Sequence, residues 1–154
     1  SRNIENYKAA NYQKEFIGTL SKITSLFVYG PGYLYFDKNK KIDDIIKLYG
    51  PFSIIFAGHS WLGDGDKTEI DPWPQSGLSK ITHKKFLFLN KEYVNLNQKL
   101  RWIKKNKFDY VFSHHQDCQM WQTKDKTQFR YLPFAYDDNY FFYSKKKKEI
   151  RSSF

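Results

Sequence analysis

The sequence predicts an α/β fold, a single domain in which short strands alternate with helices around a mainly parallel sheet. Apolar runs typical of strands lie at 25–30, 52–58 and 85–90, and apolar residues at helical spacing occur between them, at 42–49 and 93–103. Such alternation favours a parallel sheet, because each helix returns the chain to the edge where the next strand starts. The 154 residues suffice for one domain with a buried core.

The first half of the chain is expected to contain two helices and two strands. Apolar residues recur on one face over 3–20, which predicts an amphipathic helix. A strand over 25–30 follows, and a Gly-Pro-Gly turn at 30–32 closes it. The helix over 42–49 ends at a Gly-Pro pair, because proline cannot continue a helix. The next strand, 52–58, is continuously apolar, as expected of a strand covered on both faces.

The second half begins with a long stretch from Gly58 to Lys85 that is rich in Gly, Asp, Pro and Trp and has no clear period. Loops of that length in a compact domain are usually functional. The remaining elements are expected in this order: a strand over 85–90, a helix over 93–103, a strand over 108–115 with 109–112 buried, a short helix over 116–122 and a strand over 129–134.

The two ends of the chain carry a further expectation. The chain opens on a helix whose apolar face needs a sheet, without a strand ahead of it, and it ends soon after the lysine run at 145–148. We expect a three-layer, Rossmann-like domain over 1–143 that lacks its first strand, followed over 144–154 by a tail or the start of an interdomain linker.

The net charge is +10, because Lys and Arg outnumber Asp and Glu by 26 to 16. Such a charge attracts nucleic acid, anionic lipid or phosphorylated small molecules. Most of the basic residues, however, are lysines spread along predicted helices, which is typical of solvated helix faces. Nucleic acid is not the expected partner, because arginines are few and scattered and no RRM, KH or zinc-finger signature is present.

The composition also restricts the compartment. A single cysteine excludes an internal disulfide and a CxxC metal site. No apolar run approaches the ~20 residues of a membrane-spanning helix, and the N-terminus lacks the apolar core of a secretory signal. We expect a cytoplasmic protein, with contact at the inner face of the membrane through its basic helices as a further hypothesis.

Polar residues that could bind a ligand cluster at the predicted strand ends. His114, His115 and Asp117 follow one strand, and His59 follows another in "IIFAGHSW". The carboxyl ends of parallel strands meet at one edge of the sheet, where ligands bind. The alternative is local, with His114 bonded to a backbone carbonyl and Asp117 capping the next helix.

The sequence contains three candidate metal sites. Asp64 and Asp66 form a DxD pair in the long loop, which leaves open a transferase that binds a metal and a nucleotide sugar. An EF-hand starting at Asp64 lacks its glycine and its final glutamate. Zinc held by His114, His115 and Cys118 is disfavoured, because adjacent strand residues point to opposite faces. We expect no metal and no bound cofactor; GxGxxG, GxxxxGK[ST] and GxSxG are absent.

Residues 85–143 resemble the N-terminal domain of two-domain glycosyltransferases with the GT-B fold, of the family-four type. The resemblance lies in the order of parts: "NLNQKLRWIKKNKFDYVFSHH", a short helix with a tryptophan, and then "FRYLPFAYDDNYF". The last stretch resembles the turn before the crossing to the second domain in Leu132, Pro133, Phe134, Ala135, Asp137 and Asn139. In the first half only the helix–strand rhythm and the glycine-rich turn match.

The resemblance implies transfer of a sugar from a nucleotide-sugar donor to a glycan or lipid-linked acceptor. This domain would receive the acceptor, and a second domain that is not part of these residues would hold the nucleotide, so we expect no activity without it. His115 is the candidate catalytic residue, and one of the histidines could act as a general base, because the unperturbed pKa of imidazole lies near neutrality. The candidate substrate-binding residues are His59, Trp61, His114, Asp117, Gly30 and Gly32.

Two features keep other interpretations open. Trp61 and Trp73 in the long loop could stack on a sugar ring or plug the sheet edge. A second class of function is a basic α/β module, without catalysis, that binds nucleic acid or a protein partner. The gathering of histidines at strand ends favours the enzyme, because a docking surface would not need it.

Overall fold

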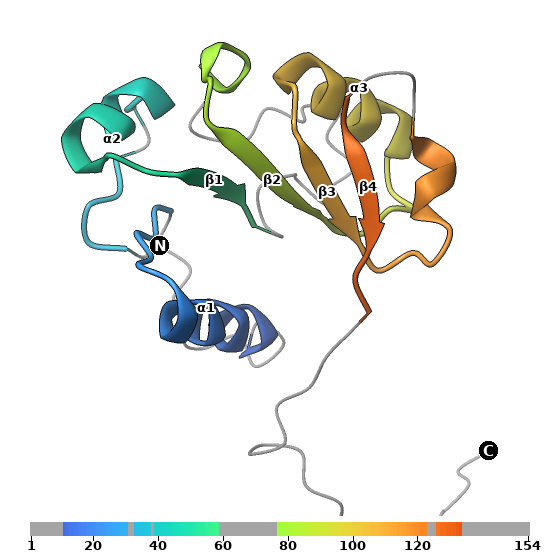
Figure 1. Ribbon diagram of the computed structural model, residues 1–154, viewed down its shortest axis with the longest axis horizontal. Helices are drawn as coiled ribbons and strands as arrows, with labels where there is room; N and C mark the ends of the chain where they lie inside the picture. The colour runs from blue at the N-terminus through green and yellow to red at the C-terminus, as the bar shows by residue number, and fades with distance from the viewer. Residues whose placement is uncertain (1–10, 31–32, 38, 59–76, 123–125, 134–154) are drawn as a thin grey trace, which may run out of the picture.

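A four-stranded, all-parallel sheet with helices on both faces forms the domain in the computed structural model (Figure 1). The structure describes residues 11–30, 33–37, 39–58, 77–122 and 126–133. The elements are α1 (Asn11–Ile23), α2 (Ile42–Tyr49), β1 (Ile54–Ala57), the 3₁₀ turn η3 (Leu78–Lys80), β2 (Lys84–Leu89), α3 (Leu96–Asn106), β3 (Tyr110–Ser113), the 3₁₀ turn η4 (Cys118–Trp121) and β4 (Gln128–Tyr131). The predicted α/β class with a mainly parallel sheet is therefore confirmed.

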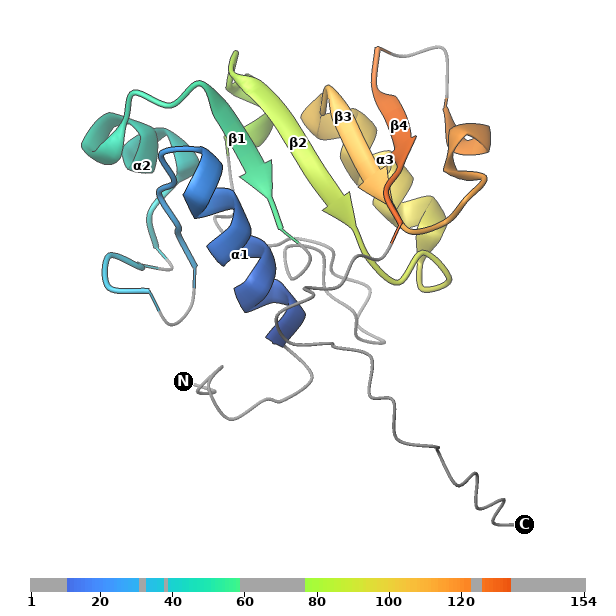
Figure 2. The same ribbon diagram turned by 60° about the horizontal axis from the view of Figure 1, so that its bottom comes forward.

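The strands follow one another across the sheet in chain order, β1-β2-β3-β4. Phe86 pairs with Tyr110 and Tyr110 with Gln128, so equivalent positions of neighbouring strands share a face. Connections between parallel strands are right-handed. In the connection between β2 and β3, the helix α3 lies on one face of the sheet (Figure 2).

The face covered by α2, α3 and the two 3₁₀ turns carries the main core. Ala57, Leu87 and Val111 of its strands are fully buried. Ile45 of α2 and Ile103 of α3 belong to the same cluster. Removing this apolar surface from water is the main favourable contribution to folding.

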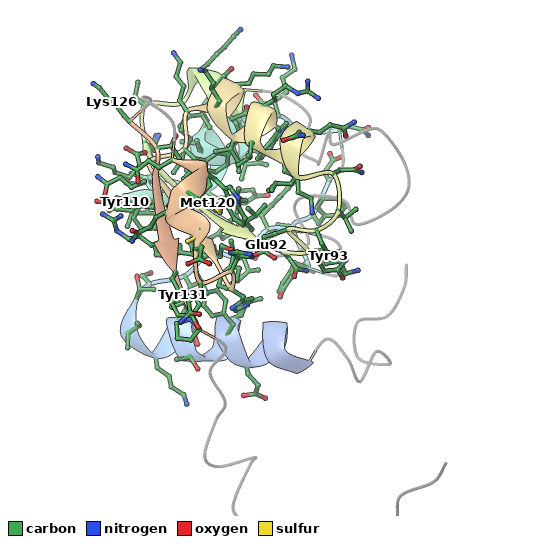
Figure 3. All side chains as sticks on the ribbon, turned by 90° about the vertical axis from the view of Figure 1, so that its right-hand side faces the viewer. Glu92, Tyr93, Tyr110, Met120, Lys126 and Tyr131 are labelled. Carbon is green, nitrogen blue, oxygen red and sulfur yellow. The ribbon has the colours of Figure 1, made fainter. Side chains whose placement is uncertain are left out.

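The opposite face is aromatic and less completely covered. Phe16 of α1 lies with its ring centroid 5.7 Å from that of Phe56 and 5.9 Å from that of Phe88, so α1 covers β1 and β2. Further along the sheet, Phe86 packs against Tyr110 and Phe112 at centroid distances of 5.2 and 6.0 Å. These three rings are half-buried, and in Figure 3 Tyr110 lies on the side of the sheet away from α3.

Most predicted elements exist, with shifted bounds. The helix over 42–49 and the strand over 85–90 are confirmed as α2 and β2, and the short helix within 116–122 is a single 3₁₀ turn. The helix expected over 3–20 is described only from Asn11 and continues to Ile23. Its first eight residues lie outside the described part of the chain.

One expectation about a strand was wrong. The stretch 25–30 belongs to no sheet, and no backbone hydrogen bond joins it to a strand among the described residues. The strand within 52–58 is present and is packed on both faces, by Phe16 of α1 on Phe56 and by the main core around Ala57. It is the edge strand β1, and Ile54 at its start is 48% exposed. An apolar run shows that side chains can be buried, but it does not show which backbone pairs with it.

None of the described helices has the length and apolar character that a membrane crossing requires.

Candidate functional site

The carboxyl edge of the sheet carries the two adjacent histidines, and their rings diverge. His114 packs over Phe88 with ring centroids 4.8 Å apart, on the aromatic face. His115 packs against Trp121 of η4 with centroids 5.1 Å apart, on the face of α3. The rings therefore share one edge of the sheet but belong to different layers, as expected of consecutive residues leaving a strand.

Hydrogen bonds give the two imidazoles opposite tautomers. The Nδ1 of His114 lies 2.7 Å from the carbonyl oxygen of Leu132, which can only accept, so this nitrogen carries the proton. The Nδ1 of His115 accepts from the backbone N–H of Asp117 at 3.2 Å, so it has no proton. In its neutral form His115 therefore carries its proton on Nε2, whereas the Nε2 of neutral His114 is the basic nitrogen.

A buried serine connects the histidine segment to the loop after β2. Ser113, the last residue of β3, is fully buried and donates its hydroxyl to a carboxylate oxygen of Glu92. The same hydroxyl oxygen accepts from the backbone N–H of His115 at 2.9 Å. Glu92 is thus held beside the histidines, and Figure 3 shows it at the carboxyl edge together with Tyr131 at the end of β4.

A buried lysine donates hydrogen bonds to the loop that carries Glu92. Lys99 of α3 is fully buried, and its ammonium group donates to the carbonyl oxygens of Asn90 at 2.8 Å and Lys91 at 3.0 Å. Lys91 and Asn95 have positive φ values of 48° and 51°, in the left-handed region that costs energy for residues with a side chain. The lysine compensates by stabilising a loop with an unfavourable backbone conformation.

Asp117 lies at the start of η4 and is exposed. Its side chain forms no capping hydrogen bond to the 3₁₀ turn. The local alternative, in which Asp117 caps the next helix, is therefore wrong, whereas the bond from His114 to a backbone carbonyl is present. A carboxylate without that capping bond remains able to contact a ligand or a nearby cation.

Several candidate residues cannot be placed against this edge. His59, Trp61 and Gly32 lie outside the described residues, as do Asp64, Asp66 and Trp73 of the long loop. Gly30 is described, and its carbonyl oxygen accepts from the N–H of Tyr33 at 3.1 Å. No interaction among the described residues joins Gly30 to His114 or His115.

The described residues contain no group of three or more His, Cys, Asp or Glu side chains placed to bind a metal ion. Cys118 is fully buried. Burial raises the pKa of its thiol, and the nearby carboxylates of Glu92 and Asp117 act in the same direction. A raised pKa disfavours the thiolate, which is the form that binds metals and attacks substrates.

A small cavity lies between α3, η4 and the start of β4. It holds about 140 Å³ and is lined mainly by apolar side chains, including Leu100, Trp121 and Phe129, with Arg101 and Lys104 also in its wall. Small-molecule sites usually enclose some 300–1,000 Å³. The cavity is therefore too small for a disaccharide, and a saccharide would have to bind on the open edge.

The sequence predicted the two histidines at this edge but not the residues that hold their segment in place. Glu92 and Lys99 carried no signal, because they lie in a turn and in a lysine-rich helix. Lys99 in particular occupies a helix whose lysines were all expected on the solvent side. The alternation of β3 was the one available signal for Ser113, since it shares the buried face with Val111.

The carboxyl edge therefore offers the carboxylates of Glu92 and Asp117 and two imidazoles of opposite tautomer, with His114 on the aromatic face and His115 on the face of α3. Such groups can donate to and accept from the hydroxyls of a polar ligand. Comparison with models of known protein families, with curated proteins and with solved structures found no match to this chain.

Proposed function

We propose that the chain is the acceptor-binding domain of a glycosyltransferase, which moves a sugar from a nucleotide-sugar donor to a glycan or a lipid-linked acceptor. The observation that carries the proposal is the cluster of Glu92, Ser113, His114, His115 and Asp117 at the carboxyl edge of a parallel sheet. Ligands of open parallel sheets bind at this edge. The order of parts over 85–143, which resembles that of such enzymes, supports the same function.

The tautomers assign different roles to the two histidines. His115 would donate from Nε2 to an acceptor or donor oxygen, because its Nδ1 already accepts from Asp117. His114 would be held in a fixed orientation, because its Nδ1–H is bound by the carbonyl oxygen of Leu132. The general base role expected of one histidine stays a prediction.

The donor nucleotide would be bound by a second domain, and no metal or cofactor is required of the described residues in this proposal. The contact with an anionic membrane surface and the cytoplasmic location stay proposals as well. They rest on the net charge of +10 and on a lipid-linked acceptor as one of the two acceptor classes.

Saturation-transfer NMR with mono- and disaccharides tests acceptor binding by this chain. We expect transfer to at least one saccharide at a concentration of about 10 mM, in the range of weak single-site binding. His115→Ala should weaken it about tenfold, which corresponds to about 1.4 kcal/mol. Lys105→Ala, at an exposed position of α3, is the matched control and should bind like the original chain. Absence of transfer to every saccharide, with no amide shifts over 113–117, would refute the proposal.

A second function is favoured by one observation, the half-buried aromatic face. Phe86, Tyr110 and Phe112 form a ring cluster, and the exposed Arg130 pairs in register with Phe112 on the next strand. Aromatic side chains next to a cation bind unpaired bases by stacking. A non-catalytic module for single-stranded nucleic acid is therefore the alternative.

Fluorescence anisotropy with a labelled single-stranded RNA separates the two functions. The stacking module predicts binding that weakens with salt and that Phe112→Ala reduces while His115→Ala does not. The acceptor domain predicts the reverse sensitivity, in a saccharide titration.

A further inference from the structure

The cavity between α3, η4 and the start of β4 has a preformed apolar wall. Leu100 and Ile103 of α3, Trp121 of η4 and Phe129 of β4 all line it. Ile103 and Phe129 belong to the buried core, and Leu100 and Trp121 pack against that core. The ring of Trp121 stands edge-on to Phe129, with centroids 6.2 Å apart and an angle of 84° between the ring planes. Because the core holds these side chains in place, a ligand would find the cavity already formed.

The volume of the cavity fits one ring. The cavity holds about 140 Å³, and an apolar cavity of roughly 150 Å³ in a protein core takes up one benzene molecule. A nucleotide or a larger cofactor does not fit, because sites for such molecules enclose about 300 Å³ or more. The group that fills the cavity is therefore the size of one aromatic side chain.

The surroundings of the cavity are basic. None of the residues that line it is acidic, and the exposed Arg101 lies in its wall. No ion pair or hydrogen bond joins the guanidinium group of Arg101 to another described residue. Lys126 is also exposed, and it directly precedes Thr127, which lines the cavity from the side of β4. Cations therefore flank the cavity from α3 and from the start of β4, and guanidinium groups bind carboxylates through two parallel hydrogen bonds.

An exposed methionine extends the apolar surface beyond the cavity. Met120, next to Trp121 in η4, is 73% exposed. Met120 and Lys126 both lie on the side of the domain that Figure 3 faces. Exposed methionines are common on surfaces that bind polypeptides, because their unbranched side chains adapt to a partner. A pocket for one aromatic anchor with polar and charged groups around it is also the usual centre of a protein–protein contact.

We propose that this surface, the cavity together with Arg101, Met120 and Lys126, binds an acidic segment of a partner protein. One aromatic side chain of that segment fills the cavity, and carboxylates on either side of it bind Arg101 and Lys126. The net charge of +10 attracts an acidic partner over a longer range. The cavity plays no part in the proposed sugar transfer, so either proposal can fail without the other.

Fluorescence anisotropy of the 154-residue chain with labelled acidic peptides tests the aromatic anchor. The probes are DEDEFEDED and its versions with tyrosine or tryptophan in the middle, and DEDEAEDED is the matched control peptide. We expect at least one aromatic peptide to bind with a Kd on the order of 100 μM, as for a weak contact with a single anchor. The alanine peptide should bind at least about tenfold more weakly, because it buries no ring.

Two variants of the chain separate the cavity from the charge. Leu100→Phe fills the cavity and should weaken the aromatic peptide about tenfold without affecting the alanine peptide, and its thermal unfolding shows whether the fold is kept. Arg101→Gln, at an exposed position, should weaken every peptide about fivefold. Lys47→Gln on α2 is the matched control, because it removes the same charge away from the cavity and should change binding less than about twofold at 0.15 M salt.

Four results would overturn the proposal. The first is no binding of any aromatic peptide up to about 1 mM. The second is equal binding of the alanine and aromatic peptides, or equal effects of Arg101→Gln and Lys47→Gln, which would mean that net charge alone attracts the peptides. The third is binding of phenylacetate as tight as that of the peptides, which would assign the cavity to a small molecule. The fourth is tighter binding of a single-stranded RNA that Leu100→Phe also abolishes, which would assign it to a base.

Discussion

A buried lysine lies at each end of the parallel strands, and the two lysines donate hydrogen bonds to different parts of the backbone. At the amino edge, Lys85 of β2 donates to the carbonyl oxygens of Leu78 at 2.9 Å, Ile81 at 3.3 Å and Asn106 at 2.7 Å. These oxygens belong to η3, to the residue after it and to the end of α3. At the carboxyl edge, Lys99 donates to the loop that presents Glu92, at the carbonyl oxygens of Asn90 and Lys91.

The difference separates polar groups that hold the fold from polar groups that hold a site. Lys85 joins elements that the core packs together in any case, and Asp109 beside it binds the backbone N–H of Lys85 at 2.9 Å. Lys99 binds a loop with left-handed residues, and this loop is also bonded to the sheet through Glu92 and Ser113. The cost of an unfavourable loop conformation is typical of functional sites.

The largest effect is expected from Lys85→Met, which keeps the apolar stem and removes the ammonium group. Three buried carbonyl oxygens lose their donor, so we expect a loss of about 2–4 kcal/mol in the free energy of unfolding. Urea denaturation of the variant and of Lys84→Met measures it. Lys84 is the matched control, because its side chain is 66% exposed and its ion pair with Asp109 is weak. Equal stability of the two variants would contradict a structural role for Lys85.

The pH dependence of the stability of the Lys85→Met and Lys84→Met variants provides an independent measurement. Burial lowers the pKa of Lys85 below 10.5, although Asp109 acts to raise it. Between the lowered pKa and 10.5 the unfolded chain binds more protons, so the Lys85 contribution to stability grows as pH rises through that window. Lys85→Met should remove this rise, and Lys84→Met should keep it.

Lys99→Met should have a smaller effect on stability and a larger one on the site. Two carbonyl oxygens lose their donor, and we expect a loss of about 1–3 kcal/mol. The loop over 90–95 should then leave its left-handed conformations, and the bond from Ser113 to Glu92 should weaken. Amide exchange of 90–95 and 113–115 checks this, with Lys105→Met as the exposed control on the same helix. An unchanged exchange rate over 90–95 would show that the loop keeps its conformation without the ammonium group of Lys99.

Elements that depend on local periodicity were predictable from the sequence, whereas the pairing of one strand with another was not. The apolar stripe of 42–49 and the run of 85–90 are properties of the residues themselves, so α2 and β2 were predictable. Pairing of 25–30 depends on a neighbouring strand, and no residue within that stretch encodes the neighbour. The histidines were predictable because they follow an apolar run. Lys99 was not, because a lysine on a lysine-rich helix reveals its burial only through the fold.

Asp109→Asn is expected to cost about 1 kcal/mol at neutral pH, since the amide keeps part of the hydrogen bonding but loses the charge. Burial acts to raise the pKa of Asp109, but hydrogen bonds from Lys85 and Lys84 outweigh it, and the pKa is lowered below 3.8. The contribution of Asp109 is therefore present above pH 3.8 and is lost as pH falls through the lowered pKa. Acid titrations of unfolding should converge for the two chains in that window, and parallel curves would contradict the assignment.

The smallest expected effect is on the tautomers of the two histidines at the carboxyl edge and not on stability. Long-range ¹⁵N–¹H NMR of the two rings should show neutral His114 with its proton on Nδ1 and neutral His115 with its proton on Nε2, as their bonds to Leu132 and Asp117 require. Ser113→Ala tests the link between these rings and the loop, because it removes the acceptor of the His115 N–H and the donor to Glu92. We expect the His115 tautomer to become mixed in that variant while the His114 tautomer stays fixed, since the N–H of Leu132 is bonded to the backbone carbonyl oxygen of Ser113, which Ser113→Ala keeps, and not to Ser113 Oγ. If both rings kept their tautomers, Ser113 would be a strand residue without influence on the site, and the carboxyl edge would be no more organised than the amino edge.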